Sequence, residues 1–214
     1  MDFAKLVWML QHGALYFPRL DQLADPFEGT LSRSEFERIR TQAAQLESVP
    51  DKLPAQWSGK FREVLMLNAR RARHSMYVNC WHLSPHESEA MWRLYSASEY
   101  SVALESTYDR LVEVLPAKLH NGCFVGLVRY LDYHHDPMPE NNSFNPVMHK
   151  RSAFVHENEV RAVVWLGDPG VGARETLEDN PLGLVVPVTL SNLIARVVIA
   201  PSKRTTSRAS GPCP

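Results

Sequence analysis

The stretch Glu157-Asn158-Glu159-Val160-Arg161-Ala162-Val163-Val164-Trp165-Leu166 places two carboxylates directly before an apolar run that is rich in β-branched residues. Such a run predicts a strand over residues 160–166. Two further β-like runs follow at residues 184–188 and 195–200, whereas the first half of the chain is rich in helical patterns. This order favours an α+β fold with a mostly antiparallel sheet, whole or split, and helices in the N-terminal half.

Hydrophobic spacing extends the prediction toward the N-terminus. Phe3, Leu6, Val7 and Leu10 recur at helical spacing, and Gly13 stands where a glycine commonly ends a helix. The remaining patterns predict helices at residues 34–46, 55–72 and 147–153, a helix beginning at Ser84, and strands at residues 14–17, 76–83, 101–105 and 124–133.

Length and charge bound the class of protein. A chain of 214 residues suits one domain, so we expect a single α+β domain over residues 1–201 and a disordered tail over residues 202–214. Lys plus Arg (23) nearly balance Asp plus Glu (24), so there is no strong nucleic-acid signal. No apolar run approaches the ~20 residues of a membrane span, and the first residues are not a basic signal region. We expect a soluble, cytoplasmic protein with no membrane partner.

Several segments together resemble a known family. They are Leu15-Tyr16-Phe17, Asp25-Pro26-Phe27-Glu28-Gly29, Cys80-Trp81-His82-Leu83-Ser84, Ala90-Met91-Trp92-Arg93-Leu94-Tyr95, and Lys150-Arg151-Ser152-Ala153-Phe154 followed by Glu157-x-Glu159-x-Arg161. In this order they resemble the bacterial family of domains of unknown function numbered twenty-nine seventy-one. The resemblance implies a strand before the first helix and an amphipathic helix after the last strand. Because this sequence has neither, we expect both ends to be trimmed or shifted in frame.

Glu157 and Glu159 are the sharpest functional signal. At this spacing the two carboxylates project from one face, and at the start of a strand they can address one ligand atom together. Cleavage of the nicotinamide N-glycosidic bond of NAD passes through an oxocarbenium-like ribose, which a nearby carboxylate stabilises. The pair therefore favours an enzyme that consumes NAD.

The chain is also similar, by analogy, to ADP-ribosyltransferases. These carry a polar or basic residue on the first strand, then a Ser-Thr-x element and then Glu-x-Glu. Here Ser106-Thr107-Tyr108 precedes Glu157-x-Glu159, and Arg19 is the candidate for the first-strand residue. The resemblance implies that Glu159 stabilises the ribosyl cation, that Glu157 activates the acceptor, and that Ser106 and Thr107 support the nicotinamide.

The same residues have structural interpretations. Glu157 and Glu159 are equally well explained as solvated charges beside Arg161, and Ser106 or Thr107 as the N-cap of a short helix.

Aromatic residues and one long loop also allow two interpretations. Trp92 and Tyr95 lie at core spacing, although an aromatic wall for a nicotinamide or adenine ring would use the same residues. The loop at residues 134–146, rich in Pro and Asn, is the candidate lid.

Asp25 and Glu28 form a second acidic pair, for which a capping box around Pro26 is the favoured interpretation. The alternative is a contact to a divalent metal or a ribose. If these two carboxylates converged with Glu157-x-Glu159 and Lys150, a metal-dependent phosphodiesterase would become a lesser alternative.

Cys80, His82 and His86 suggest zinc but lack a fourth ligand, so no metal is expected.

The main hypothesis is therefore an ADP-ribosyltransferase-like enzyme that uses NAD and an unknown acceptor. The rival is a non-catalytic module of a defence or toxin system, which binds a protein partner. The enzyme requires Glu157, Glu159, Ser106 and Trp92 around one concave site, whereas a binding module does not.

Overall fold

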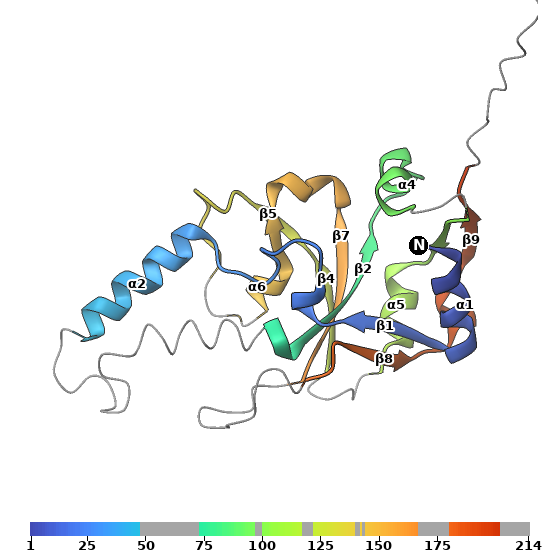
Figure 1. Cartoon of the computed structure of the whole chain (residues 1–214), viewed down its shortest axis with the longest axis horizontal. Helices are drawn as coiled ribbons and strands as arrows, with labels where there is room; N and C mark the ends of the chain where they lie inside the picture. Colours follow the sequence, from blue (N-terminus) through green and yellow to red (C-terminus); the bar gives the residue numbers. More distant parts are fainter. Residues whose placement is uncertain are drawn as a thin grey trace, which may run out of the picture.

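Figure 1 shows a computed structural model of the chain, which describes residues 1–47, 73–96, 100–116, 122–139, 142, 144–166 and 180–201. The helix expected at residues 55–72 and the tail at residues 202–214 lie outside the described residues. Helices combined with mostly antiparallel strands confirm the α+β class.

Short helices and strands follow one another along the described chain. The helices are α1 (Phe3–His12), α2 (Arg33–Glu47), α4 (Glu89–Tyr95), α5 (Tyr108–Val114), α6 (Asn145–Met148) and α7 (Leu190–Leu193), with the 3-10 helices η1 (Leu20–Gln22) and η3 (Ser152–Glu157). The strands are β1 (Ala14–Pro18), β2 (Met76–His82), β3 (Val102–Glu105), β4 (Cys123–Leu127), β5 (Arg129–Leu131), β6 (His149–Arg151), β7 (Glu159–Trp165), β8 (Gly183–Pro187) and β9 (Arg196–Ile199).

Within the described residues, the β-structure is split into four parts. β7 lies between β2 and β4 in an antiparallel sheet of three strands. β1 pairs with β8 and β3 with β9, both antiparallel, whereas β5 and β6 form a parallel pair. The expected split and mostly antiparallel sheet is thus confirmed, with β7 as the central strand of its largest part.

The two faces of β7 have different surroundings. Ala162 and Val164 belong to the larger hydrophobic core, which also includes residues of α1, β1 and α5. Val163, on the opposite face, packs in a second core with Val147 of α6. Arg161 shares the face of Val163, because residues two apart in a strand point the same way. This second face therefore changes from apolar to charged toward the start of β7.

The helix expected at the start of the chain is present as α1, and residues at both of its ends cap it. Asp2 caps its N-terminus by accepting a hydrogen bond from the Ala4 N–H, and Gly13 ends it in the left-handed region at φ 56°. Asp2 also forms a bridge with Ser101. The first residues of the chain therefore pair next to the start of β3.

Three local expectations are wrong. α4 begins at Glu89 with Ser88 as its N-cap, whereas the Ser84 hydroxyl closes a turn before it. The strand expected at residues 124–133 is divided into β4, which belongs to the three-stranded sheet, and β5, which pairs with β6 instead. The helix expected at residues 147–153 is replaced over much of its length by β6 and η3. In the last two cases pairing with distant segments overrides local preference.

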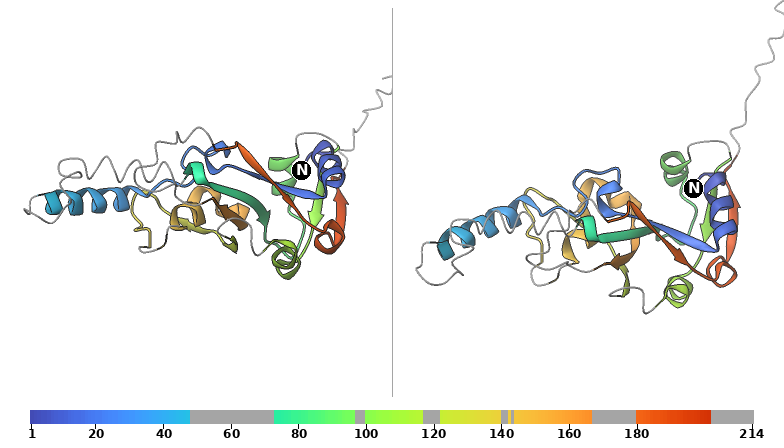
Figure 2. Two further views of the ribbon diagram at one scale, coloured as in Figure 1. Left: turned by 90° about the horizontal axis from the view of Figure 1, so that it is seen from below. Right: turned by 60° about the horizontal axis from the view of Figure 1, so that its bottom comes forward.

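α2 projects from one end of the molecule, away from the sheets, as both views of Figure 2 show. Its first turn is tied to the body by backbone and hydroxyl contacts. The Arg33 N–H donates to the Tyr133 carbonyl, and the Ser34 hydroxyl donates to the Asp136 carbonyl. The loop expected to act as a lid is therefore anchored to α2 at this end.

Gly29 offers a test of how tightly the turn that carries Glu28 is packed. Its φ is 68°, and a Cβ there would lie 2.4 Å from Leu20 Cδ2, whereas a Cβ on Gly13 would meet open space. Gly29→Ala should lower the free energy of unfolding by about 2–4 kcal/mol, and Gly13→Ala by only about 1–2 kcal/mol. Urea unfolding of both variants measures the difference. Equal losses would show that Leu20 moves aside without cost.

Candidate functional site

Arg161 is a fully buried cation in the middle of the central strand. Its guanidinium donates to both carboxylate oxygens of Glu28, at 3.1 and 3.3 Å, and to both of Glu159, at 3.0 and 2.9 Å. It also donates to the Val147 carbonyl at 2.6 Å. A buried charge is tolerated only when it is paired and hydrogen-bonded, and Arg161 meets this requirement with partners from three segments.

Lys150 of β6 is the second cation of the site. Its Nζ lies 3.0 Å from Glu28 Oε1, 2.5 Å from Glu157 Oε2 and 3.6 Å from Glu159 Oε2. We call Glu28, Lys150, Glu157, Glu159 and Arg161 the charge cluster. All five residues are buried, so the interpretation of the two glutamates as solvated surface charges is wrong. Three carboxylates share these two cations, so the cluster contains one more acidic side chain than basic side chains.

The backbone conformation at Asn158 places Glu157 and Glu159 in the charge cluster. Glu157 ends η3, Asn158 adopts the left-handed conformation at φ 36°, and Glu159 begins β7. Asparagine tolerates this conformation better than most residues. Asn158 is fixed to the end of β2, because its carbonyl accepts from the Leu83 N–H and its side chain donates to the Leu83 carbonyl. The reversal at Asn158 therefore lets two carboxylates reach one cation from different elements.

Glu157 forms the outer edge of the charge cluster. Its side chain is 11% exposed, compared with 6% for Glu159 and 1% for Glu28. The Tyr95 hydroxyl donates to Glu157 Oε1 at 2.7 Å, and a ring nitrogen of His82 lies 2.6 Å from the Glu157 carbonyl oxygen. Glu157 is therefore the most exposed carboxylate of the cluster, and Tyr95 of α4 lies against it.

The protonation states of the basic and phenolic groups follow from these contacts. Burial alone would lower the pKa of Lys150, but its hydrogen bond with Glu157 and the charges of Glu28 and Glu159 raise it above the ordinary value. Burial and the hydrogen bond to Glu157 raise the pKa of Tyr95. Lys150 is therefore a cation, and Tyr95 a neutral hydrogen-bond donor, across the physiological range.

Cys80 pairs with Arg161 across the strands, and its thiol lies beside the Glu159 carboxylate. Cys80 is exposed as a residue, but desolvation of its thiol by the groups packed beside it, together with the neighbouring carboxylates, raises its pKa despite the opposing charge of Arg161. A thiol with a raised pKa is a poor nucleophile. Cys80 therefore acts as a neutral neighbour of the cluster and not as a nucleophile.

Asp25 and Glu28 do not form the expected capping box. The Asp25 carboxylate accepts from the Phe27 N–H and pairs with Arg151, whose guanidinium also lies over the Phe27 ring. Glu28 turns inward to Arg161 instead of back to the start of the turn. The favoured interpretation is therefore wrong, because a buried cation competes for the carboxylate more strongly than a local N–H does.

The proposed nicotinamide-side residues each have a structural partner. The Ser106 hydroxyl donates to the Leu193 carbonyl, and Thr107 caps α5 by accepting from the Arg110 N–H. The capping interpretation is thus confirmed for Thr107. No contact within the described residues joins either hydroxyl to the charge cluster. Their role near a nicotinamide stays a prediction.

Arg19 is buried and pairs with Asp21 at 2.6 Å, while its guanidinium also donates to the Asn180 carbonyl. These contacts account for a buried arginine without a ligand. A role in NAD binding stays a prediction here too.

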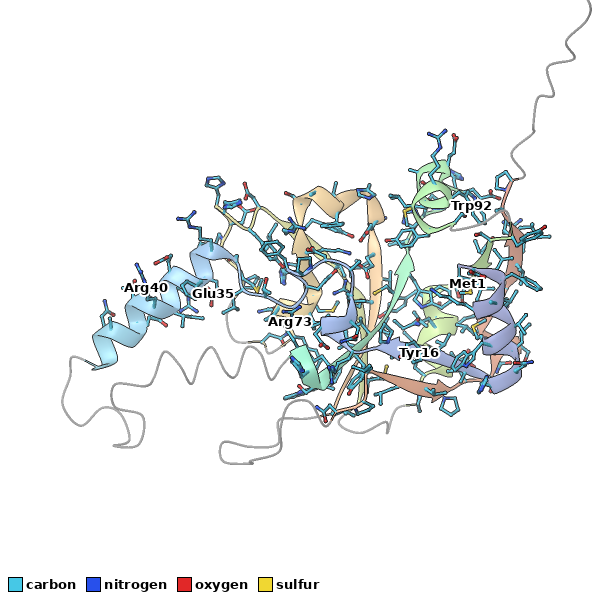
Figure 3. The ribbon with its side chains drawn as sticks, viewed as in Figure 1. Met1, Tyr16, Glu35, Arg40, Arg73 and Trp92 are labelled. Carbon is cyan, nitrogen blue, oxygen red and sulfur yellow. The ribbon has the colours of Figure 1, made fainter. Side chains whose placement is uncertain are left out.

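Trp92 lies on α4, at the end of the molecule away from α2 (Figure 3). It is half-buried, and its indole N–H donates to Glu87 at 3.4 Å. α4 has no buried residue, so the expectation of a core helix is wrong. The Trp92 side chain is only half-buried and that of Tyr95 is exposed, so both aromatic rings are accessible to a ligand. Their role as an aromatic wall stays a prediction.

Glu28, Glu157 and Glu159 converge on Lys150, but Asp25 pairs with Arg151, so the full convergence required for a metal-dependent phosphodiesterase is not met. Each of the three carboxylates also has Lys150 or Arg161 on its oxygens. Among the described residues, no group of three or more His, Cys, Asp or Glu side chains is arranged to hold a metal ion.

Comparison with known proteins finds no match among protein-family models, curated proteins or solved structures. Both family resemblances therefore stay predictions. In the part of the chain that the structure describes, no helix is long and apolar enough to cross a membrane.

Sequence reasoning underrated Arg161, although the sequence carries a signal for it. An arginine flanked by Val160 and Ala162 in a buried run must find buried carboxylates, since an unpaired charge there is too costly. Glu28 is too distant in sequence for that argument to select it. The pairing of Glu28 with Arg161 depends on the packing of the turn at residues 25–29 against β7, which the tertiary structure determines.

Arg161→Met should destabilise the protein strongly, because it leaves Glu28 and Glu159 buried with one cation fewer. We expect a loss of about 3–5 kcal/mol in the free energy of unfolding. The control Arg196→Met removes an exposed ion pair with Glu105 and should cost less than about 1 kcal/mol. Urea denaturation measures both. Similar losses in the two variants would contradict the structural role of Arg161.

Proposed function

We propose that the chain is an ADP-ribosyltransferase-like domain that cleaves the nicotinamide N-glycosidic bond of NAD at Glu157. The observation that carries the proposal is the charge balance of the cluster, in which three carboxylates share two cations. A buried site with one excess negative charge favours a cationic guest. The oxocarbenium-like ribose formed during cleavage is such a guest, and its positive charge appears only in the transition state.

The geometry favours Glu157 over Glu159 as the carboxylate that meets the ribose. Both oxygens of Glu159 accept hydrogen bonds from Arg161, and its side chain lies deeper. Glu157 is bound by a lysine and a hydroxyl, and it lies at the edge. In this proposal Glu159 and Arg161 hold the site together, while Glu157 faces the reacting carbon.

The proposed reaction breaks the bond between ribose C1′ and the nicotinamide nitrogen, and the bonding electrons leave with neutral nicotinamide. The acceptor atom then forms a new bond to C1′ and transfers its proton to a carboxylate. Glu157 serves both steps, first as the anion beside the cation and then as the base. The exposed ring of Tyr95 supplies aromatic surface next to this carboxylate.

A protein-binding module is the second candidate function, and exposed apolar side chains favour it. Phe3 and Leu10 on α1, and Leu94 on α4, are each more than half exposed. Exposed apolar surface of this kind often marks a contact with a partner. A binding module needs no turnover, so measurement of nicotinamide release separates the two functions.

Glu157→Gln should lower nicotinamide release from NAD by at least about 100-fold, because the amide cannot neutralise the ribosyl cation. Lys150 keeps its contacts with Glu28 and Glu159, and the amide oxygen still accepts from Tyr95, so the melting temperature should change little. Glu89→Gln, at an exposed position of α4, is the matched control and should release nicotinamide at the wild-type rate. Chromatography of NAD incubations with each purified protein gives the rates. Wild-type turnover by Glu157→Gln would remove Glu157 from the mechanism, and no turnover by the wild type would favour the binding module.

A further inference from the structure

α4 is held to the rest of the molecule unusually loosely. None of its residues is buried, and Leu94 and Tyr95 are 59% and 52% exposed. A helix of this length is not stable in water by itself and normally depends on a packed apolar face. The other helix of the same length, α5, follows that rule, because its Leu111 is buried in the larger core. α4 therefore lacks the usual source of helix stability.

One hydrogen bond connects α4 to the site. Within the described residues, the other side-chain contacts of α4 are local: Ser88 caps Met91, Glu87 accepts from Trp92, and Glu89 pairs with Arg93. Among the side-chain hydrogen bonds of α4 in the described residues, only that of the Tyr95 hydroxyl reaches another part of the fold, where it donates to Glu157 Oε1. The last residue of α4 is thus attached to the outermost carboxylate of the charge cluster.

We propose that α4 is a gate over Glu157, latched by the Tyr95 hydroxyl. In the latched state Tyr95 occupies the Glu157 oxygen that would otherwise face a ligand, so the contact is autoinhibitory. When the latch opens, Glu157 is released. α4 can then close over a bound ligand and cover the apolar side chains that it now exposes. The link to NAD rests on the proposed function, whereas the movement of α4 and the release of Glu157 do not.

The sequence provides a matched pair of variants for the test. Tyr95→Phe deletes the latch hydroxyl and leaves the ring. Tyr108→Phe deletes the hydroxyl of a tyrosine whose residue exposure is equal, at 52%, on a helix of equal length; this hydroxyl has no hydrogen bond within the described residues. Both substitutions are at exposed positions, so neither should change the melting temperature of the whole protein appreciably.

Two measurements on the full chain without ligand decide the proposal. Amide hydrogen exchange should become about fivefold faster in residues 89–95 of Tyr95→Phe, as expected for loss of one hydrogen bond that limits opening. Modification of the Glu157 carboxyl by a water-soluble carbodiimide and an amine, followed by mass spectrometry, should accelerate by a similar factor. Tyr108→Phe should match the wild type in both. Unchanged exchange or unchanged Glu157 modification in Tyr95→Phe would overturn the gate.

Incubation with NAD separates the gate from the proposed function. If both hold, NAD slows exchange in residues 89–95 of the wild type, and Tyr95→Phe releases nicotinamide faster than Tyr108→Phe does. Absence of turnover in every variant would refute the proposed function, while the gate would still be judged by the two measurements without ligand. Slower turnover in Tyr95→Phe than in Tyr108→Phe would overturn autoinhibition by the latch.

Discussion

The burial of Arg161 is the constraint on which the rest of the site depends. Its guanidinium binds carboxylates from the turn before α2 and from its own strand, and it also reaches a carbonyl of α6. A buried guanidinium cannot lose its charge, so the loss of its partners would leave an unpaired buried charge and destabilise the fold. The positions of these segments relative to β7 are therefore fixed by Arg161. The close approach of α6 is possible because Gly126, opposite Arg161 on β4, has no side chain: a Cβ there would meet Met148 at 2.9 Å.

The charge cluster contains three carboxylates and two cations, and this imbalance is the basis of the proposed function. Arg161 engages two carboxylates, Lys150 engages three, and Glu157 is left at the edge with only a shared cation and a phenolic hydroxyl. A purely structural network would be expected to balance its charges, since excess buried charge costs stability. The most exposed carboxylate of the cluster is also the one to which α4, a helix without a buried residue, is attached. Chemistry and movement are therefore expected at the same place.

Local signals succeeded where neighbouring residues decide the structure. The left-handed Gly13, the Thr107 cap and the β-branched run of β7 all depend on preferences within a few residues. The same signals failed at Ser84, because Ser88 offers a competing cap nearer the helix. They failed again at Lys150, where pairing of β6 with β5 replaced a helix. Propensity is a weak guide whenever a distant strand can supply hydrogen bonds.

The sequence by itself determined the α+β class, the presence of a strand after Glu159 and the identity of the two glutamates as the residues of interest, because each is encoded by patterns along short stretches of the chain. Only the tertiary structure decided that these glutamates are buried, that Glu28 and Lys150 join them, and that the Tyr95 hydroxyl donates to Glu157. These contacts connect residues up to 133 positions apart, as in Glu28 and Arg161. A charge in a buried strand shows that partners must exist, but only the folded chain selects which carboxylates they are.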